Sequence, residues 1–179
     1  PYEIEKLTQY ILKEPEFAYF NNIFIFALNT GMRLNEIVQM QWNNIDFKER
    51  KIVIRNKANF KTKTGKIRNI PINNTLLELL QRIKPNNVSP DYYLFGKGQF
   101  SYTKHYISRK FSQFVKRANI NPNLHFHSCR HTFITNLVKN NVALTKVQKL
   151  AGHSNIQTTL IYTHLHIDDL RDAVETLNL

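Results

Sequence analysis

Apolar residues recur at helical spacing along most of the chain and alternate only in one short central stretch. In the first part of the sequence this pattern predicts a helix over residues 4–12 and a largely buried second helix over residues 17–29. Gly31 is suited to a left-handed cap, and residues 34–40 restart a short helix after it. Arg33 is therefore expected at a junction between two helices.

The central stretch predicts a small hairpin. Residues 51–55 and 67–72 are short, β-branched runs bounded by turn residues, and Thr64-Gly65 supplies a turn near the second run. The expected fold is mainly α-helical with a small antiparallel β-hairpin or sheet, an α+β arrangement.

The second half of the sequence predicts further helices, separated by a polar loop over residues 85–91 and by Pro122. They are a helix capped by Asn73 or Asn74 and reaching Arg82, helices over residues 107–118 and 133–138, a short helix capped by Thr145 and ending at Gly152, a helix capped by Asn155 and running through Tyr162, and a closing helix over residues 170–177.

The length of 179 residues suits one domain, 1–179, with a sizeable core. Because Pro1 stands in place of methionine, we expect a fragment of a longer protein. The longest apolar run, residues 23–28, is far too short to cross a membrane, and no signal peptide is visible. A single cysteine, Cys129, excludes a disulfide framework and fits a reducing, cytoplasmic setting.

Charge singles out the middle of the chain. The 25 basic residues outnumber the 13 acidic ones for a net charge of +12, yet residues 51–150 alone hold 19 basic and 2 acidic side chains. Charge this one-sided predicts a surface that binds a polyanion. A membrane surface fits less well, since the basic residues follow a strand-and-turn pattern rather than one face of a helix.

The densest polar cluster runs from His125 to His131 and leaves three interpretations open. His127 and His131 share a helical spacing, and with His125 or Cys129 they could complete a tetrahedral zinc site, although no known ligand spacing matches and Arg130 adds positive charge. The histidines could instead only form hydrogen bonds at a helix start. A third interpretation has His127 and Arg130 bind a phosphate together, one helical turn apart.

Residues 145–162 are similar to a helix-turn-helix, with Gly152 in the turn between two short helices. This similarity supports an alternative, a non-catalytic DNA-binding regulator. The second helix has few side chains that could read a DNA groove, which weakens that alternative.

Four motifs taken together resemble the catalytic domain of the tyrosine recombinase/integrase family. They are Gly31-Met-Arg-Leu-Asn-Glu-Ile37, Lys63-Thr-Gly-Lys-Ile-Arg-Asn-Ile-Pro71, His127-Ser-Cys-Arg-His131, and Leu150-Ala-Gly-His-Ser154 followed by Tyr162. The resemblance extends from about Ile4 to the C-terminus. Cys129 stands where an aliphatic residue is commoner, and the family's N-terminal core-binding domain is absent.

The resemblance implies a role for each site residue. Tyr162 would attack a DNA phosphodiester and form a 3′-phosphotyrosyl bond, while Arg33 and Arg130 hold the phosphate. Lys63 would protonate the departing 5′-oxygen, with Lys61 and Lys66 as competitors for that role. His127 would accept or relay the tyrosine proton, His153 would bind the phosphate, and which of them acts as the general base stays open. The remaining expected residues are Glu36, which orients the site, and four candidates for contacts with the DNA backbone, Lys57, Lys61, Lys66 and Arg68.

The implied reaction is site-specific recombination of double-stranded DNA, as in a phage or mobile-element integrase or a Xer-type recombinase. No metal, ATP or other cofactor is expected, since two arginines supply positive charge and the phosphotyrosyl ester stores the energy of the broken bond. Type IB topoisomerases share this chemistry and are the nearest enzymatic alternative. A homotetramer on DNA, formed through the C-terminal helix, and a prokaryotic cytoplasm with association to the nucleoid are further expectations.

Overall fold

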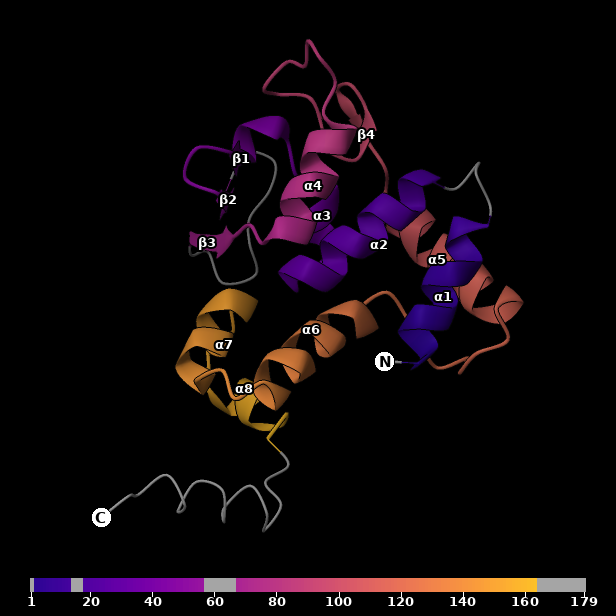
Figure 1. Ribbon diagram of the computed structural model, residues 1–179, viewed down its shortest axis with the longest axis vertical. Helices are drawn as coiled ribbons and strands as arrows, with labels where there is room; N and C mark the ends of the chain where they lie inside the picture. Colours follow the sequence, from indigo (N-terminus) through magenta and orange to yellow (C-terminus); the bar gives the residue numbers. More distant parts are fainter. Residues whose placement is uncertain (1, 14–17, 57–66, 164–179) are drawn as a thin grey trace.

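The computed structural model describes residues 2–13, 18–56 and 67–163 (Figure 1). Within these ranges the chain is mainly helical, with two small antiparallel sheets, as the sequence predicts. The elements, in chain order, are α1 (Tyr2–Leu12), α2 (Ala18–Thr30), α3 (Leu34–Val38), the 3₁₀ helix η2 (Trp42–Asn44), β1 (Ile45–Asp46), β2 (Lys51–Ile54), β3 (Arg68–Pro71), α4 (Asn74–Ile83), β4 (Gly96–Lys97), β5 (Phe100–Ser101), α5 (Lys104–Arg117), α6 (Ser128–Lys139), α7 (Leu144–Ala151) and α8 (Gln157–Leu160).

Helix α2 forms the centre of the core. It is apolar on almost every side, and it packs against α1, α4 and α6. Phe20 of α2 lies 4.8 Å from Phe114 of α5 between ring centroids, and Phe111 of α5 contacts Phe126 edge-on at 5.7 Å. Burying large aromatic side chains of this kind contributes most of the hydrophobic stabilisation in a core. The site residues near the end of α2 thus rest on a rigid support.

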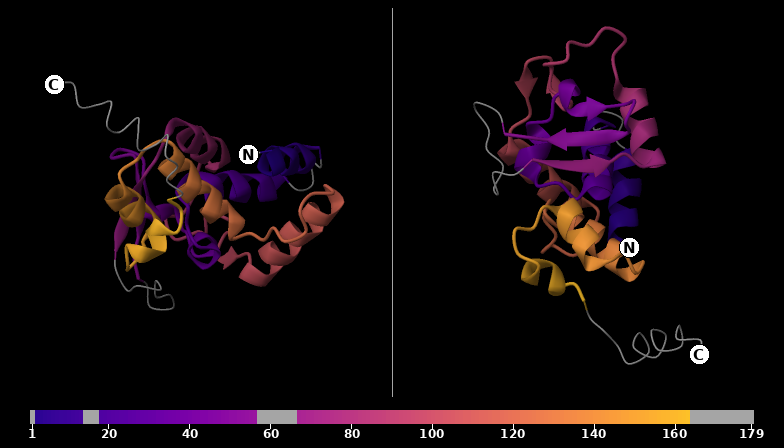
Figure 2. Two further views of the ribbon diagram at one scale, coloured as in Figure 1. Left: turned by 90° about the horizontal axis from the view of Figure 1, so that it is seen from below. Right: turned by 90° about the vertical axis from the view of Figure 1, so that its left-hand side faces the viewer.

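The three-stranded sheet has the order β1-β2-β3, with every pair antiparallel. Ile52 and Ile54 of β2 are buried while Lys51 and Val53 are partly exposed, which is the alternation that a half-buried strand requires. The register pairs Ile54, the last residue of β2, with Arg68, the first residue of β3. Arg68 therefore lies at the end of the hairpin where the chain returns from the connection between the two strands. The predicted hairpin is confirmed, and the views in Figure 2 show its strands at one side of the molecule.

Helices α6, α7 and α8 lie together at one end of the molecule (Figures 1 and 2). Helix α7 packs against α6, α8 and strand β3, so residues far apart in the sequence meet where these elements converge. A small apolar cluster of Ile134, Val147 and Ala151 joins α6 to α7. In the described part of the chain, no helix is long and apolar enough to span a membrane.

Some predicted boundaries are wrong. Helix α7 begins at Leu144 with Ala143 in the N-cap position, so Thr145 lies inside the helix rather than capping it. Helix α8 ends at Leu160, and Tyr162 therefore lies in the turn after it. The two-residue strands β1, β4 and β5 are additional to the predicted elements. The predicted helix over residues 170–177 lies outside the described residues.

Candidate active site

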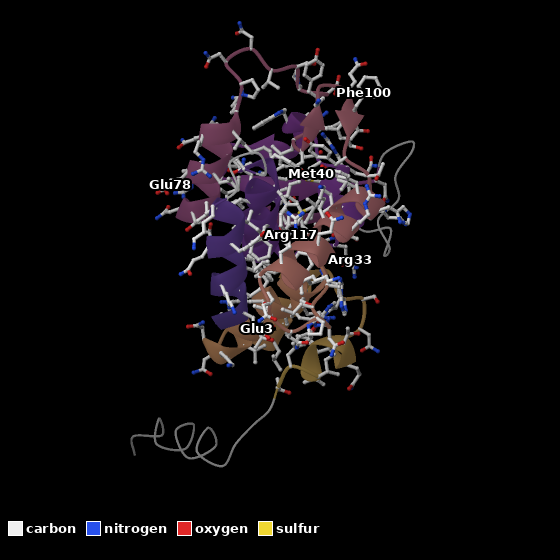
Figure 3. All side chains as sticks on the ribbon, turned by 90° about the vertical axis from the view of Figure 1, so that its right-hand side faces the viewer. Glu3, Arg33, Met40, Glu78, Phe100 and Arg117 are labelled. Carbon is white, nitrogen blue, oxygen red and sulfur yellow. The ribbon has the colours of Figure 1, made fainter. Side chains whose placement is uncertain are left out.

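Arg33 is positioned by the sharp end of α2. Gly31 adopts φ +59°, a left-handed conformation that favours glycine, and a Cβ atom there would lie 2.2 Å from the Phe133 ring of α6. The chain then turns so that Arg33 precedes α3, with its backbone N–H donating to Glu36 Oε2 at 2.9 Å. Its guanidinium donates through Nη2 to the carbonyl of Gly152 at 3.3 Å. Arg33 thus joins the start of α3 to the C-terminal end of α7. Figure 3 labels its position among the side chains.

Glu36 holds two arginines. Its buried carboxylate accepts hydrogen bonds from Arg68 Nη1 at 2.8 Å and Nη2 at 2.7 Å, and it pairs with Arg33 Nη1 at 3.4 Å. Burial alone would raise the pKa of Glu36, but the hydrogen bonds and charge of Arg68, with those of Arg33, outweigh it and lower the pKa. Glu36 is therefore ionised in the folded protein, in keeping with an orienting role.

Arg68 uses both of its terminal nitrogens in this network. The sequence predicts that it contacts the DNA backbone, but both of its terminal nitrogens bind Glu36 and its side chain is only 10% exposed. The side chain also runs directly over Gly152, where a Cβ atom would lie 2.9 Å from Arg68 Cδ. A deeply buried carboxylate recruits the nearest cation, and here it draws Arg68 inward.

Arg130 lies in the first turn of α6 and is only 3% exposed. Its Nη1 donates to the carbonyl of Gly31 at 2.7 Å, while its Nη2 has no hydrogen-bond partner in the described part of the chain. Burial, and then the charge of Arg33, lower the pKa of Arg130 to about 10, so it stays charged at neutral pH. A buried donor without a partner is costly, and an anion that accepted its hydrogen bond would remove that cost.

His127, at the N-cap of α6, and His153, just after α7, both lie within electrostatic reach of the two arginines. Desolvation of each ring, together with the charges of Arg130 and Arg33, lowers the pKa of both histidines to about 4. His153 follows the left-handed Gly152, and its Nδ1 lies 2.9 Å from Thr159 Oγ1. Both rings are therefore neutral at neutral pH, and each can donate one hydrogen bond.

Tyr162 is held in the turn after α8. Its backbone N–H donates to the carbonyl of Thr159 at 3.1 Å, and its ring packs against the small apolar cluster between α6 and α7. Its hydroxyl is hydrogen-bonded to His131 Nδ1. Partial burial raises the pKa of Tyr162, and the charge of Arg130 opposes that rise. The hydroxyl is therefore protonated at rest.

The structure brings most of the expected residues together. One network of hydrogen bonds and charge interactions includes Arg33, Glu36, Arg130, His153 and Tyr162. The same arginines lower the pKa of His127. Beside them, a recess between β3 and α7 is lined by Arg68 and Lys149 among other residues. Four lysines, Lys57, Lys61, Lys63 and Lys66, lie outside the described residues.

From the sequence, His131 is a zinc candidate, a hydrogen-bonding histidine and part of a family motif, but no role in the reaction is predicted for it; the structure places it on the tyrosine hydroxyl. The feature of the sequence that could have pointed to His131 is its position four residues after His127, on the helix that also carries Arg130. Cys129, the other zinc candidate, is buried in the main core, where burial raises the pKa of its thiol. Within residues 2–13, 18–56 and 67–163, no three His, Cys, Asp or Glu side chains gather as metal ligands.

The chain is similar to proteins that are named integrases and tyrosine recombinases. Residues 1–168 match the phage integrase family. The tyrosine recombinase XerC of Pediococcus pentosaceus is 29% identical over 97% of this chain and 65% of its own length. The tyrosine recombinase XerA of Saccharolobus solfataricus is 33% identical over 84% of this chain and 47% of its own length.

Solved structures show the same fold. The Tn1549 transposon integrase in complex with a circular intermediate DNA superposes with a TM-score of 0.82 and 25% identity, over 97% of this chain and 63% of that one. The catalytic domain of bacteriophage HP1 integrase, at 23% identity, matches in fold with a TM-score of 0.69 over 100% of this chain and 94% of its own. The chain thus spans less than two thirds of the XerC and Tn1549 relatives.

Proposed function

The chain belongs to the phage integrase family, and from that premise we propose that it is the DNA-cleaving catalytic domain of a site-specific tyrosine recombinase. The observation that carries the proposal is the convergence of two arginines from distant elements, Arg33 and Arg130, with Tyr162 close enough to Arg130 for their charges to interact. Arg130 reaches back to Gly31 across 99 positions, and Arg33 reaches Gly152 across 119. Such a site matches the chemistry of attack on a phosphodiester.

Arg33 and Arg130 bind the scissile phosphate in this proposal. Its non-bridging oxygens carry negative charge that shifts in the transition state, and planar guanidinium groups can hold such oxygens with two parallel hydrogen bonds. Nη2 of Arg130, which has no partner among the described residues, is the proposed donor for one of these oxygens. Removing one preorganised donor of this kind typically costs about 2.7–4 kcal/mol of transition-state stabilisation.

The covalent step follows from the nucleophile. Tyr162 Oη loses its proton and attacks the phosphorus, a phosphotyrosyl bond to the DNA 3′ end forms, and the bond to the 5′-oxygen breaks. Lys63 is the proposed donor of the proton that the departing 5′-oxygen takes up. His153 and His127 are neutral and donate hydrogen bonds to the phosphate or relay protons. The ester conserves the energy of the phosphodiester, so a 5′-hydroxyl can reverse the step without ATP.

Double-stranded DNA is the proposed partner. The solved relatives include an integrase in complex with DNA. Exposed lysines also occur on the helices that hold the site, Lys139 on α6 and Lys146 and Lys149 on α7. Neutralising DNA phosphates with such cations releases counterions and makes binding strongly salt-dependent. A homotetramer on DNA and a cytoplasmic, nucleoid-associated location belong to the same proposal.

The test traps the covalent intermediate on whichever DNA site the protein itself selects. The protein is incubated with sheared genomic DNA of its source organism, denatured in detergent with EDTA, and the protein-bound fragments are sequenced. Fragments that share one sequence, and that disappear with Tyr162→Phe but persist with the exposed control Tyr92→Phe, support the enzyme. DNA that is retained before denaturation and fully lost after it would instead support the non-catalytic regulator.

A further inference from the structure

The hydrogen bond between Tyr162 and His131 goes beyond the expected set of site residues. The Tyr162 hydroxyl meets Nδ1 of His131, and the two ring centroids lie 5.6 Å apart. Among the described residues, no hydrogen bond joins the tyrosine hydroxyl to His127, the residue expected to take its proton. The geometry points to a proton acceptor one helical turn further along α6.

We propose that His131 is the general base that takes the proton of the Tyr162 hydroxyl as the tyrosine attacks DNA. This inference rests on the proposed function and assigns one of its steps. The Oη–H bond of Tyr162 breaks and an Nδ1–H bond forms, so the neutral ring becomes an imidazolium while the oxygen bonds to phosphorus. His131 therefore touches the reacting atom itself.

The surroundings of His131 suit this task. Partial desolvation, together with Arg130 and His125, lowers its pKa, so the ring is neutral at neutral pH and one of its nitrogens holds a lone pair. The proposal assigns that lone pair to Nδ1, the nitrogen that meets the tyrosine hydroxyl. Among the described residues, the charged and titratable groups that face it are Tyr162 from the turn after α8 and His125, His127 and Arg130 at or just before the start of α6. No carboxylate is among these groups to hold His131 in its charged form.

His131 also has a route for losing the proton. It is exposed, so the second nitrogen of the ring can release a proton to solvent after Nδ1 has gained one. The His127 ring lies edge-on at 5.0 Å between centroids, and the charges of both Arg130 and Arg33 lower its pKa. The two histidines thus divide the work, with His131 on the nucleophile and His127 beside the phosphate-binding groups.

One experiment tests the geometry without any DNA. Long-range nitrogen-15 NMR of the free protein at neutral pH identifies which nitrogen of His131 carries the proton. The proposal requires a proton on Nε2 and a bare Nδ1, and it requires that Tyr162→Phe change the Nδ1 shift. A proton on Nδ1, donating to the tyrosine oxygen, would overturn the proposal, as would a shift unaffected by Tyr162→Phe.

A kinetic experiment tests the proton transfer on a DNA site identified by trapping. His131→Asn keeps an acceptor oxygen but cannot take up a proton, so single-turnover cleavage at saturating DNA should fall about 100-fold at neutral pH, within the range for general bases. The variant's rate should then climb with pH as hydroxide replaces the base, whereas the wild-type rate levels off above the pKa of His131. The exposed control His105→Asn on α5 should retain the wild-type profile.

The outcomes separate the two claims. If the wild type forms no adduct, the proposed function itself fails. If the wild type forms an adduct while His131→Asn cleaves at the wild-type rate with the wild-type pH profile, the recombinase assignment stands and His131 is not the base. A pH profile lost in His127→Asn but retained in His131→Asn would assign the proton to His127 and overturn the proposal.

Discussion

At the scale of single residues, Arg130 combines burial with an unused donor. One terminal nitrogen holds the Gly31 carbonyl, and the other has no partner within the described residues. The first bond fixes the guanidinium, and the second nitrogen stays available for an anion. A lysine at this position would keep the charge but present a single nitrogen, so it could not fill both positions.

Arg130→Lys should therefore cleave DNA about 100-fold more slowly or worse, while its affinity for uncleaved DNA stays close to that of the wild type. Single-turnover cleavage and equilibrium binding, measured at one salt concentration, separate the two effects. The exposed Arg82→Lys on α4 is the matched control and should change neither quantity. Equal cleavage rates for Arg130→Lys and wild type would show that the buried fork has no role in the reaction.

The ionised state of Glu36 predicts how the free energy of unfolding depends on pH. Its pKa is lowered in the folded state, so its ionised form contributes stability above the unfolded-state pKa of about 4.3, and that contribution is lost as pH falls through the folded pKa. Glu36→Gln leaves the Arg68 and Arg33 guanidiniums without a counter-charge and should cost about 3–5 kcal/mol at neutral pH. Urea unfolding of both proteins measures the difference, which should shrink as the pH drops below about 4.3. A constant difference down to about pH 3 would contradict the assignment.

At the scale of elements, the turn at Gly152 joins the end of α7 to the site. Gly152 adopts φ +69°, its carbonyl accepts from Arg33, and its Cα faces the Arg68 side chain closely enough that a Cβ would lie 2.9 Å from it. Gly98 adopts φ +60° too, but a Cβ there would meet only ordinary contacts with Tyr92. The two glycines thus share the backbone conformation and differ in their neighbours.

Gly98→Ala should lose about 1–2 kcal/mol of unfolding free energy from the left-handed backbone alone. Gly152→Ala should lose more, because Arg68 must also move, and its cleavage rate should fall as Arg33 and His153 shift with the turn. Thermal or urea unfolding of both variants gives the comparison. Equal losses of unfolding free energy would mean that Arg68 can move without destabilising the protein and that its packing on Gly152 does not position the site.

Sequence patterning predicts the longer elements well and the short ones poorly. The core helices and the hairpin follow from apolar periodicity, and the left-handed ends of α2 and α7 follow from Gly31 and Gly152. The strands of two residues are too short to show any period. The end of α8 also escapes prediction, because Thr159 turns its hydroxyl to His153 and the chain closes with a tight turn at Tyr162.

At the scale of the whole molecule, the site depends on contacts between residues about 100 positions apart in the sequence. No local pattern encodes the approach of Arg130 to Gly31 or of Arg33 to Gly152. The family resemblance supplies that grouping, and the structure adds what the resemblance lacks, the inward Arg68 and the pairing of His131 with Tyr162. The central excess of basic charge thus has two parts, with Arg68 and Arg130 buried in the site and exposed lysines such as Lys146 available to meet DNA.

The central claim is that Tyr162 becomes covalently joined to DNA, and peptide mapping of the trapped adduct tests it most directly. The chain has eight tyrosines, but trypsin releases residues 150–171 as a peptide in which Tyr162 is the only one. After nuclease digestion, mass spectrometry should find a nucleotide 3′-phosphate on this peptide, attached to the Tyr162 oxygen. The same added mass attached to any residue other than Tyr162 would contradict the claim. So would an adduct that forms equally in Tyr162→Phe.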